Sequence, residues 1–369
     1  MREDKILCWY GKDPFEAGKT LMESCGIWEN WSLSDHIGLK PNLVVSKKAS
    51  FGATTHPEFC EGIITFLQEK GFQNISILEG SWVGDRTELA FKVCGYSDIS
   101  KKYSVPLVDL QLDQSDICKG SNGEYRICRS ILELDRLINI PVLKGHCQTA
   151  MTCALKNLKG CIPNSEKQRY HRGDLSQAIA DLNEILKSDL ILVDALEGDP
   201  DFEEGGNPFT LNLFMAALDP VLLDSYACSL LGLKTLDVPY IKKAVGLGVG
   251  SDAISADTIQ SLNKGEGLDN LQRSSLATEL SGHIHEKGAC SACFSSLTQA
   301  LKQMQEKSLP LPETIRIGQD FKKKTSDGLG VGDCLSRCSS FVPGCPPEPS
   351  KIADYLRNSL ENKFSNDLK

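Results

Sequence analysis

Five cysteines near the end of the chain have the residue type and spacing of a metal centre. Cys290 and Cys293 form a C-x-x-C pair in "CSACFSSLTQAL", and Cys334, Cys338 and Cys345 follow in "GDCLSRCSSFVPGCPP". Thiolates are soft ligands for iron-sulfur clusters and for zinc, and a short C-x-x-C turn commonly supplies two of them. The spacing therefore predicts a metal site with two ligands from one turn and the others from separate loops.

Turn-forming neighbours favour four of the five thiols. Gly332 precedes Cys334, and glycine and prolines surround Cys345 in "PGCPP", where a proline follows the cysteine as it often does in iron-sulfur proteins. A structural zinc ion is the main alternative, although zinc modules tend to use two tight C-x-x-C pairs and this tail has one. Unligated thiols are the third interpretation. The expected 4Fe-4S ligands are Cys290, Cys293, Cys334 and Cys345, with Cys338 as the substitute.

A basic stretch lies in the middle of the chain. Residues 144–172 contain six lysines and arginines against the single acid Glu166, a local charge of +5 in a chain of net charge −9. Lys144 and His146 follow a predicted strand, and a helix over residues 149–158 would bring Lys156 and Lys159 to one face. These cations could hold a phosphate or carboxylate, and a solvated basic face is the alternative.

An acidic stretch, "DALEGDPDFEEGGNP", begins at Asp194 and also follows a predicted strand. Its six carboxylates could supply a general base, a site for a hard cation or a partner for the basic stretch. A plain acidic loop is the alternative interpretation. Asp194, next to the strand, is the member that we expect to be catalytic. The carboxylates are Asp194, Glu197, Asp199, Asp201, Glu203 and Glu204.

The glycine-rich "GLGVG" at residues 246–250 is a weak motif. It lacks the G-x-G-x-x-G spacing of a dinucleotide-binding loop and is not clearly placed between a strand and a helix. We therefore do not expect nucleotide binding there.

The elements that position these groups alternate along the chain. Short β-rich runs at residues 37–45, 74–80, 105–110, 136–144 and 189–196 are separated by helical patterns, among them residues 55–72, 174–187 and 219–233. Thr55 and Glu58 resemble a capping box at the first of these helices. The alternation predicts an α/β fold with a mainly parallel sheet and helices on both faces, followed by a cysteine-rich metal-binding segment. Ligands of such sheets bind at the carboxyl ends of strands.

Composition limits the classes of function. The chain has 369 residues and 15 cysteines, and its start lacks the apolar segment of a signal peptide, so we expect a cytoplasmic protein with reduced or metal-bound thiols. No apolar run is long enough to span a membrane, and the net negative charge argues against nucleic-acid binding. We expect a core domain over residues 1–285 and an iron-sulfur segment over residues 286–369.

Seven separated motifs together resemble one family. They are "LKPNLV", "GATTHPE", "LEGSWVGDRTELAFKVCGY", "VLKGHCQTAMTCALKNLKGCIP", "KQRYHRG", "LILVDALEG" and "ALDPVLLDSYACSLLGL". In this order they resemble the domain-of-unknown-function family number 362, many of whose members are described only as iron-sulfur center proteins. The resemblance implies a pocket in which Lys144, His146 and Asp194 are catalytic. The substrate-binding residues that it implies are Lys40, Asn42, Thr55, His56, Glu79, Lys156, Asn157 and Lys159.

The cysteine tail departs from that family. Many relatives carry a pair of C-x-x-C-x-x-C runs, which this chain lacks, whereas "GCPP" resembles a ligand turn in the small subunits of hydrogenase-type and quinone-reductase complexes. This likeness is local. It leaves the cluster type and the ligand set open.

The motifs lead to one leading hypothesis and two alternatives. The leading hypothesis is a redox-active 4Fe-4S protein, an oxidoreductase if it is an enzyme, whose core binds a small anion and whose cluster exchanges electrons with the pocket or a redox partner protein. One alternative is a racemase, isomerase or lyase for a hydroxy acid, in which Lys144 and His146 transfer protons and the cluster is structural. The other is a non-catalytic scaffold, metal-delivery protein or zinc-stabilised binding protein.

Overall fold

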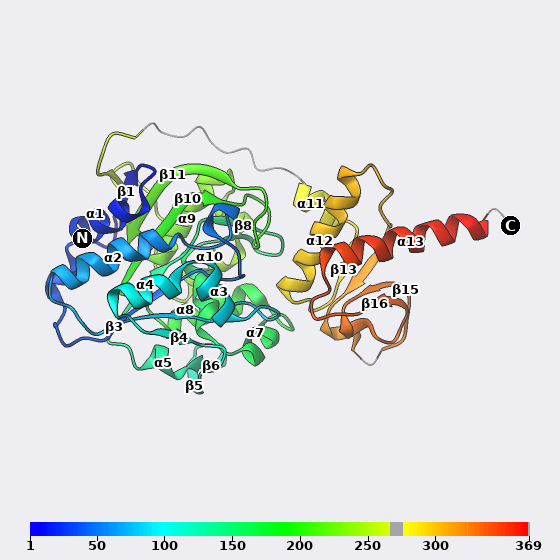
Figure 1. Cartoon of the computed structure of the whole chain (residues 1–369), viewed down its shortest axis with the longest axis horizontal. Coiled ribbons are helices and arrows are strands. Elements are labelled where there is room, and N and C mark those ends of the chain that lie inside the picture. The colour runs from blue at the N-terminus through cyan, green and yellow to red at the C-terminus, as the bar shows by residue number, and fades with distance from the viewer. Residues whose placement is uncertain (266–275, 323, 368–369) are drawn as a thin grey trace. The chain divides into compact units, whose positions relative to one another are not determined.

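The computed structural model describes residues 1–265, 276–322 and 324–367, with the backbone alone for 276–278 and 362–367. Contacts divide the chain into two units, Met1–Lys167 with Ser176–Arg273, and Gln168–Leu175 with Ser274–Lys369 (Figure 1). The expected domain boundary, between residues 285 and 286, falls within strand β13 (Ile284–Glu286) of the second unit. The second unit therefore begins earlier than expected.

One large sheet organises the first unit. Within the described residues, eight strands form it in the order β12-β1-β11-β10-β7-β2-β3-β4. Strands β10, β7, β2, β3 and β4 are parallel, whereas β11 is antiparallel to both of its neighbours. The predicted mainly parallel sheet is thus confirmed. The strands are β1 (Ile6–Tyr10), β2 (Ile37–Pro41), β3 (Ile75–Glu79), β4 (Leu107–Asp109), β7 (Arg136–Ile140), β10 (Leu190–Gly198), β11 (Phe209–Ala217) and β12 (Ile259–Ser261).

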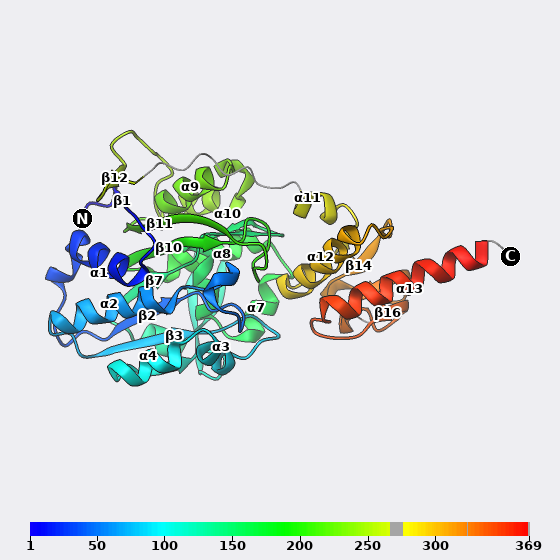
Figure 2. The ribbon, with the colours of Figure 1, turned by 45° about the horizontal axis from the view of Figure 1, so that its top comes forward.

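Helices cover both faces of this sheet (Figure 2). Because successive side chains of a strand point to opposite faces, Ile37 and Leu39 pack into the main apolar core with helices α1 and α2, whereas Lys40 lies on the other face. On that second face Asn139 of β7 reaches helix α6. The helices are α1 (Pro14–Cys25), α2 (Pro57–Glu69), α3 (Thr87–Val93), α4 (Tyr96–Tyr103), α5 (Arg129–Leu132), α6 (Ala154–Asn157), α7 (Asn164–Tyr170), α8 (Leu175–Ile185), α9 (Pro220–Leu230) and α10 (Pro239–Gly246).

The helix considered over residues 149–158 forms only over its second half, Ala154–Asn157. Strand β8 (Lys144–His146) pairs antiparallel with β9 (Ala150–Thr152), and the helix begins only at Ala154. Ala150 has a φ of +63°, a left-handed conformation that closes this tight turn and cannot continue a right-handed helix. A second hairpin joins β5 (Ser115–Gly120) to β6 (Gly123–Cys128).

The second unit contains its own parallel sheet. Its described residues form four strands in the order β13-β14-β15-β16, each parallel to the next. Helix α12 (Ser291–Glu306) connects β13 to β14, and α13 (Pro349–Asp367) follows β16 and packs against α12. The remaining elements are α11 (Leu276–Ser281), β14 (Ile315–Ile317), β15 (Ser326–Val331) and β16 (Cys338–Val342).

No helix among the described residues combines the length and the apolar character that crossing a membrane requires.

Candidate functional site

The residues expected to form a core pocket gather at one place in the large sheet. The chain runs outward from β2 through β3 to β4, and then returns to place β7 and β10 on the opposite side of β2. The carboxyl ends of β2 and β7 therefore flank the switch point at which α/β sheets usually bind ligands. Lys40 and Asn42 come from β2 and the loop after it, Glu79 from β3, and Lys144 and His146 from the segment that follows β7.

A buried ion pair lies at the ends of β2 and β3. Lys40 Nζ is 2.8 Å from Glu79 Oε1 and also donates to the carbonyl of Pro41 at 2.7 Å. The two carboxylate oxygens of Glu79 accept hydrogen bonds from the backbone N–H groups of Leu43 and Gly80, each at 2.7 Å. Because Lys40 and Glu79 both make these additional hydrogen bonds to the backbone, the ion pair holds the ends of β2 and β3 together.

A chain of side-chain amides crosses the switch point. Asn42 Nδ2 donates to Asn157 Oδ1 at 2.9 Å, and Asn157 Nδ2 donates to Asn139 Oδ1 at 2.8 Å. Asn139 Nδ2 in turn donates to the carbonyl of Ala154 at 2.9 Å. These buried amides fix one another's orientation and connect β2 and β7 to α6.

Thr55 belongs to the same network and does not cap helix α2. Its hydroxyl accepts from the backbone N–H of Asn42 and donates to the carbonyl of Ile140, both at 2.9 Å. The N-cap residue of α2 is His56, which makes no side-chain capping bond. The predicted capping box is therefore wrong, because the Thr55 hydroxyl bridges two strand ends.

Lys144 is almost completely buried, and all three of its ammonium hydrogens have acceptors. Nζ donates to Asn42 Oδ1 at 3.2 Å, to the carbonyl of Glu203 at 2.8 Å and to the carbonyl of Ala53. Burial lowers the pKa of Lys144 to about 7. The side chain thus fastens three segments together, and it loses its proton far more readily than an exposed lysine.

His146 faces a carboxylate of the acidic stretch. Its Nδ1 accepts from the backbone N–H groups of Gln148 and Thr149, so Nε2 carries the proton and lies 2.7 Å from Glu203 Oε2. This contact is short but poorly aligned for a hydrogen bond. Lys156 Nζ lies 3.3 Å from the same oxygen, while Glu203 Oε1 is buried with no hydrogen-bond partner. Burial lowers the pKa of His146 to about 4.

His56 lies between two carboxylates on the more accessible side of this region. Its Nδ1 is 2.8 Å from Asp194 Oδ2, its backbone N–H donates to the same oxygen at 2.7 Å, and its Nε2 is 3.6 Å from Glu197 Oε2. Burial favours the neutral ring, but the charge and the hydrogen bond of Asp194 outweigh it and raise the pKa of His56 to about 9. The side chain keeps 13% of its surface exposed, so the imidazolium can meet solvent.

Segment 199–206 of the acidic stretch covers Lys144 and His146 of the basic stretch. Segment 199–206 is fixed by Asp199, whose carboxylate accepts from the backbone N–H groups of Asp201, Phe202 and Asn207. Gly145 donates its N–H to the carbonyl of Asp199 at 2.6 Å, and a Cβ at Gly145 would lie 1.9 Å from the carbonyl oxygen of Pro200. The absence of a side chain at Gly145 therefore lets segment 199–206 close over Lys144 and His146.

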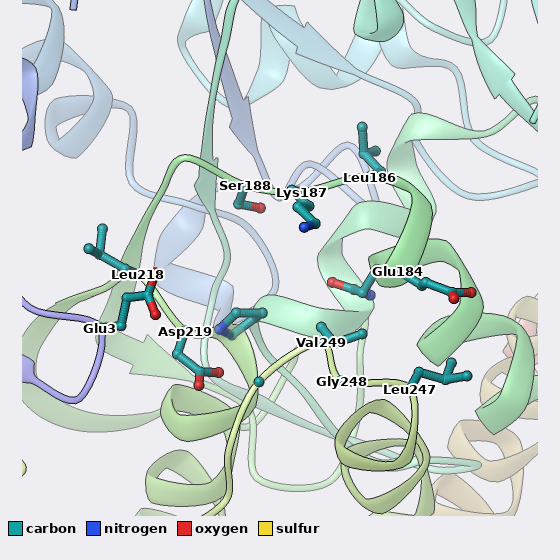
Figure 3. Close-up of a pocket in the computed structure, with 13 residues that line it drawn as sticks. Glu3, Glu184, Leu186, Lys187, Ser188, Leu218, Asp219, Leu247, Gly248 and Val249 are labelled. Carbon is teal, nitrogen blue, oxygen red and sulfur yellow. The ribbon is translucent and has the colours of Figure 1, made fainter. Parts of the chain in front are cut away.

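Most of the expected pocket residues are consequently buried. Lys40, Thr55, His146 and Asp194 have no exposed surface, whereas Lys159 is partly exposed on the 3₁₀ turn Leu158–Cys161. A cavity of about 400 Å³ lies elsewhere in the first unit and includes Lys187, Asp219 and part of "GLGVG" (Figure 3). None of the expected pocket residues lines it. They form a closed polar network instead.

Four thiols of the second unit lie at the same edge of its parallel sheet. Cys290 and Cys293 follow β13 at the start of α12, Cys334 follows β15, and Cys345 follows β16. Because the four strands are parallel, their carboxyl ends meet at one edge and bring these loops together. Burial raises the pKa of Cys293, and the charges of Cys290, Cys345 and Cys334 raise it further, so these three thiols lie near Cys293.

Glycines hold the loops around Cys293. A Cβ at Gly332 would lie 3.5 Å from Cys293 Sγ, and the φ of +94° at Gly332 is one that few other residues adopt. The turn before Cys334 is tied to the turn before Cys345, because the N–H of Asp333 donates to the carbonyl of Gly344 at 3.0 Å and the N–H of Gly344 donates to Asp333 Oδ1 at 2.8 Å.

The fifth thiol points elsewhere. Cys338 Sγ donates to the carbonyl of Gly328 and accepts from the hydroxyl of Ser326, both at 3.2 Å, and its side chain packs beside Phe321 and Leu335. As placed, no group of three or more His, Cys, Asp or Glu among the described residues could hold a metal ion. Ligation would therefore require the four loop thiols to turn toward a common centre.

A family model described as "Domain of unknown function (DUF362)" matches residues 37–229, which is more than half of the chain and includes every expected pocket residue. The protein belongs to the DUF362 family. A curated relative of this DUF362 protein is the "Thylakoid-associated protein sll1697" of Synechocystis sp., 26% identical over 258 residues that cover 65% of the chain and 78% of the relative.

A solved structure also shows a distant likeness to the DUF362 protein. It is the lactate racemase apoprotein from Thermoanaerobacterium thermosaccharolyticum, with 12% sequence identity and a TM-score of 0.38. The match covers 59% of the DUF362 protein and 55% of the racemase chain, so it spans little more than half of that neighbour's length.

Glu203 and Gln319 are among the residues of these sites that were not selected from the sequence. Glu203 was one of six acidic candidates, but Asp194 was preferred because it is next to a strand. Charge complementarity between the basic and acidic stretches is the signal that could have selected Glu203. Gln319 has its Nε2 3.4 Å from Cys290 Sγ. No sequence pattern indicates this position, because the strand before it, β14, is too short to be recognised.

The pKa values of His56 and His146 are expected to be shifted in opposite directions from the ordinary value. NMR of the imidazole C–H groups should give a pKa of about 9 for His56 and about 4 for His146, with His56→Gln and His146→Gln assigning the signals. Since the pKa of His56 is above its ordinary value of 6.5, its stabilising contribution is full below pH 6.5 and is lost as the pH rises through 9. Ordinary values near 6.5 for both rings would contradict this account of the site.

Proposed function

We propose that this DUF362 protein is an iron-sulfur protein whose second unit holds one 4Fe-4S cluster. The supporting observation is the meeting of four thiols at the carboxyl edge of a parallel sheet, where three separate loops supply them. Four cysteines are the donor set that such clusters use. The proposed ligands are Cys290, Cys293, Cys334 and Cys345.

The chain supplies the soft ligands and their surroundings. When bound, the cluster would carry one electron at a time between two partner proteins that are themselves one-electron carriers. Cys345 is exposed, whereas Cys293 is only partly exposed and its sulfur lies against the turn at Gly332, so the proposed ligand set has one solvent-facing side. Electrons would pass most readily through that side.

Spectroscopy of protein purified and reconstituted without oxygen tests this proposal. We expect broad visible absorption that bleaches on reduction, together with an electron paramagnetic resonance signal in the reduced state. A structural zinc ion uses the same four thiols but has no redox chemistry. Colourless protein with one tightly bound zinc would overturn the iron-sulfur proposal in favour of that alternative.

We propose as a second candidate that the core binds a small hydroxy acid. The supporting observation is the unpartnered Glu203 Oε1, buried beside His146 and Lys156, because buried polar atoms seldom lack a partner. A ligand hydroxyl could donate to Glu203 Oε1 while its carboxylate contacts the lysine. Since these side chains are buried, the ligand would enter only when segment 199–206 opens.

Thermal unfolding with glycolate and with propionate tests this second candidate. Glycolate is expected to raise the Tm, because a ligand that binds only the folded state stabilises it. Propionate has a carboxylate but no hydroxyl and should raise the Tm less. Equal effects of the two acids, or no effect of glycolate, would contradict a hydroxy-acid site.

A further inference from the structure

Among the described strands of the second unit, only β14 is followed by no thiol, and Gln319 lies at that strand end. It follows β14, as the proposed ligands follow β13, β15 and β16, and it is 8% exposed. Its backbone N–H donates to the carbonyl of Gly288 at 3.0 Å, which ties it to the loop that leads to Cys290. The residue is therefore fixed at the same sheet edge as the thiols.

The orientation of the Gln319 amide follows from its partners. Oε1 accepts from Arg172 Nε at 2.8 Å, and an arginine can only donate, so the oxygen must face Arg172. Nε2 then faces the other way, where it donates to the carbonyl of Gln168 at 2.9 Å and lies 3.4 Å from Cys290 Sγ. An N–H group is thus directed at a proposed ligand sulfur.

We propose that Gln319, oriented by Arg172, is a positioning residue that raises the reduction potential of the cluster by hydrogen bonding to Cys290 Sγ. This inference rests on the proposed function. Reduction adds one electron to a cluster that thiolates already make negative, and an N–H donor stabilises that added charge. In measurements of the potential, an electrode or a reductant such as dithionite supplies the electron.

Gln319 also makes contacts that would give it a purely structural role. Through Arg172 and the Gln168 carbonyl it also fastens segment 168–175 to the rest of the second unit. Loss of that role alone would lower stability and leave the potential unchanged. The potential therefore separates the two roles.

The test compares the midpoint potentials of the wild type, Gln319→Leu and Gln305→Leu, all measured on the full chain. Gln305 is exposed near the end of α12, so Gln305→Leu repeats the substitution away from the thiols. Gln319→Leu is expected to lower the equilibrium constant for reduction about tenfold, or about 59 mV for a one-electron couple. Gln305→Leu should leave it unchanged.

Iron and sulfide contents make the possible failures distinguishable. A wild type without a cluster overturns the proposed function and this inference with it. Equal cluster content and equal potential in wild type and Gln319→Leu overturn this inference alone. If Gln319→Leu does not retain iron, Gln319→Glu keeps the side-chain length and the acceptor for Arg172, and it too must have a lowered potential for the inference to hold.

Discussion

Replacement of Cys293 by serine is expected to abolish iron binding, with retention falling to about a tenth of the wild type or less. The Cys293 sulfur lies against the turn at Gly332, and the charges of three other thiols act on it, so the other three proposed ligands all lie near it. A serine oxygen is a hard ligand and a poor replacement for a thiolate on iron. Iron and sulfide assays after anaerobic reconstitution measure the effect.

Cys338→Ser is the matched control for this experiment. The Cys338 sulfur already bonds to Ser326 and to the Gly328 carbonyl, and it is not among the thiols that act on Cys293. The variant should therefore retain its iron. Equal loss of iron from both variants would contradict the assigned ligand set, as would full retention by Cys293→Ser.

Gly145→Ala is expected to destabilise the first unit by roughly 3 kcal/mol, at the upper end of the effects of overpacking. The new Cβ would lie 1.9 Å from the backbone oxygen of Pro200, and no flexible side chain can move aside to relieve the clash. Segment 199–206 would have to shift, which would move Glu203 away from His146 and Lys156. Urea unfolding, followed by a probe in the first unit, measures the loss.

Gly246→Ala controls for the substitution itself. Gly246 is the last residue of α10, has no positive φ, and has no atom within 4 Å of a built Cβ. Alanine there should raise stability by about 0.5 kcal/mol, because glycine is a poor helix residue. Similar stabilities of the two variants would show that segment 199–206 does not close tightly over Gly145.

Hydrophobic patterning was sufficient to predict the framework of the first unit. The five predicted strands, of which the first is at residues 37–45 and the last at residues 189–196, correspond to β2, β3, β4, β7 and β10. The predicted helices correspond to α2, α8 and α9. These elements are buried strands and amphipathic helices, whose local sequence carries their periodicity. Strands β1, β11 and β12 of this sheet were not predicted.

Tertiary contacts decided the features that local sequence could not predict. The residues from Thr149 to Thr152 were expected in a helix, but the pairing of β9 with β8 places them in a hairpin. The hydroxyl of Thr55 meets the Ile140 carbonyl, which is 85 residues away, in preference to capping the next helix. Such long-range partners override a local propensity.

Local sequence patterns also could not predict that the core site is closed. Lys144 and Glu203 are 59 residues apart in the sequence, and only the folded structure shows that they are in contact. In the second unit, strands of three to six residues, one of them containing the sequence "SDGLGV", are too short and too rich in glycine for periodicity to indicate a sheet. The thiols could be selected from their spacing, but the sheet edge that gathers them could not.

The amount of iron, acid-labile sulfide and zinc bound per chain, in protein purified without oxygen, tests the central claim most directly. If the four thiols at one sheet edge of the second unit hold a 4Fe-4S cluster, we expect about four irons and four sulfides per chain, with zinc well below one equivalent. One equivalent of zinc without sulfide, or no metal after reconstitution with iron and sulfide, would contradict it.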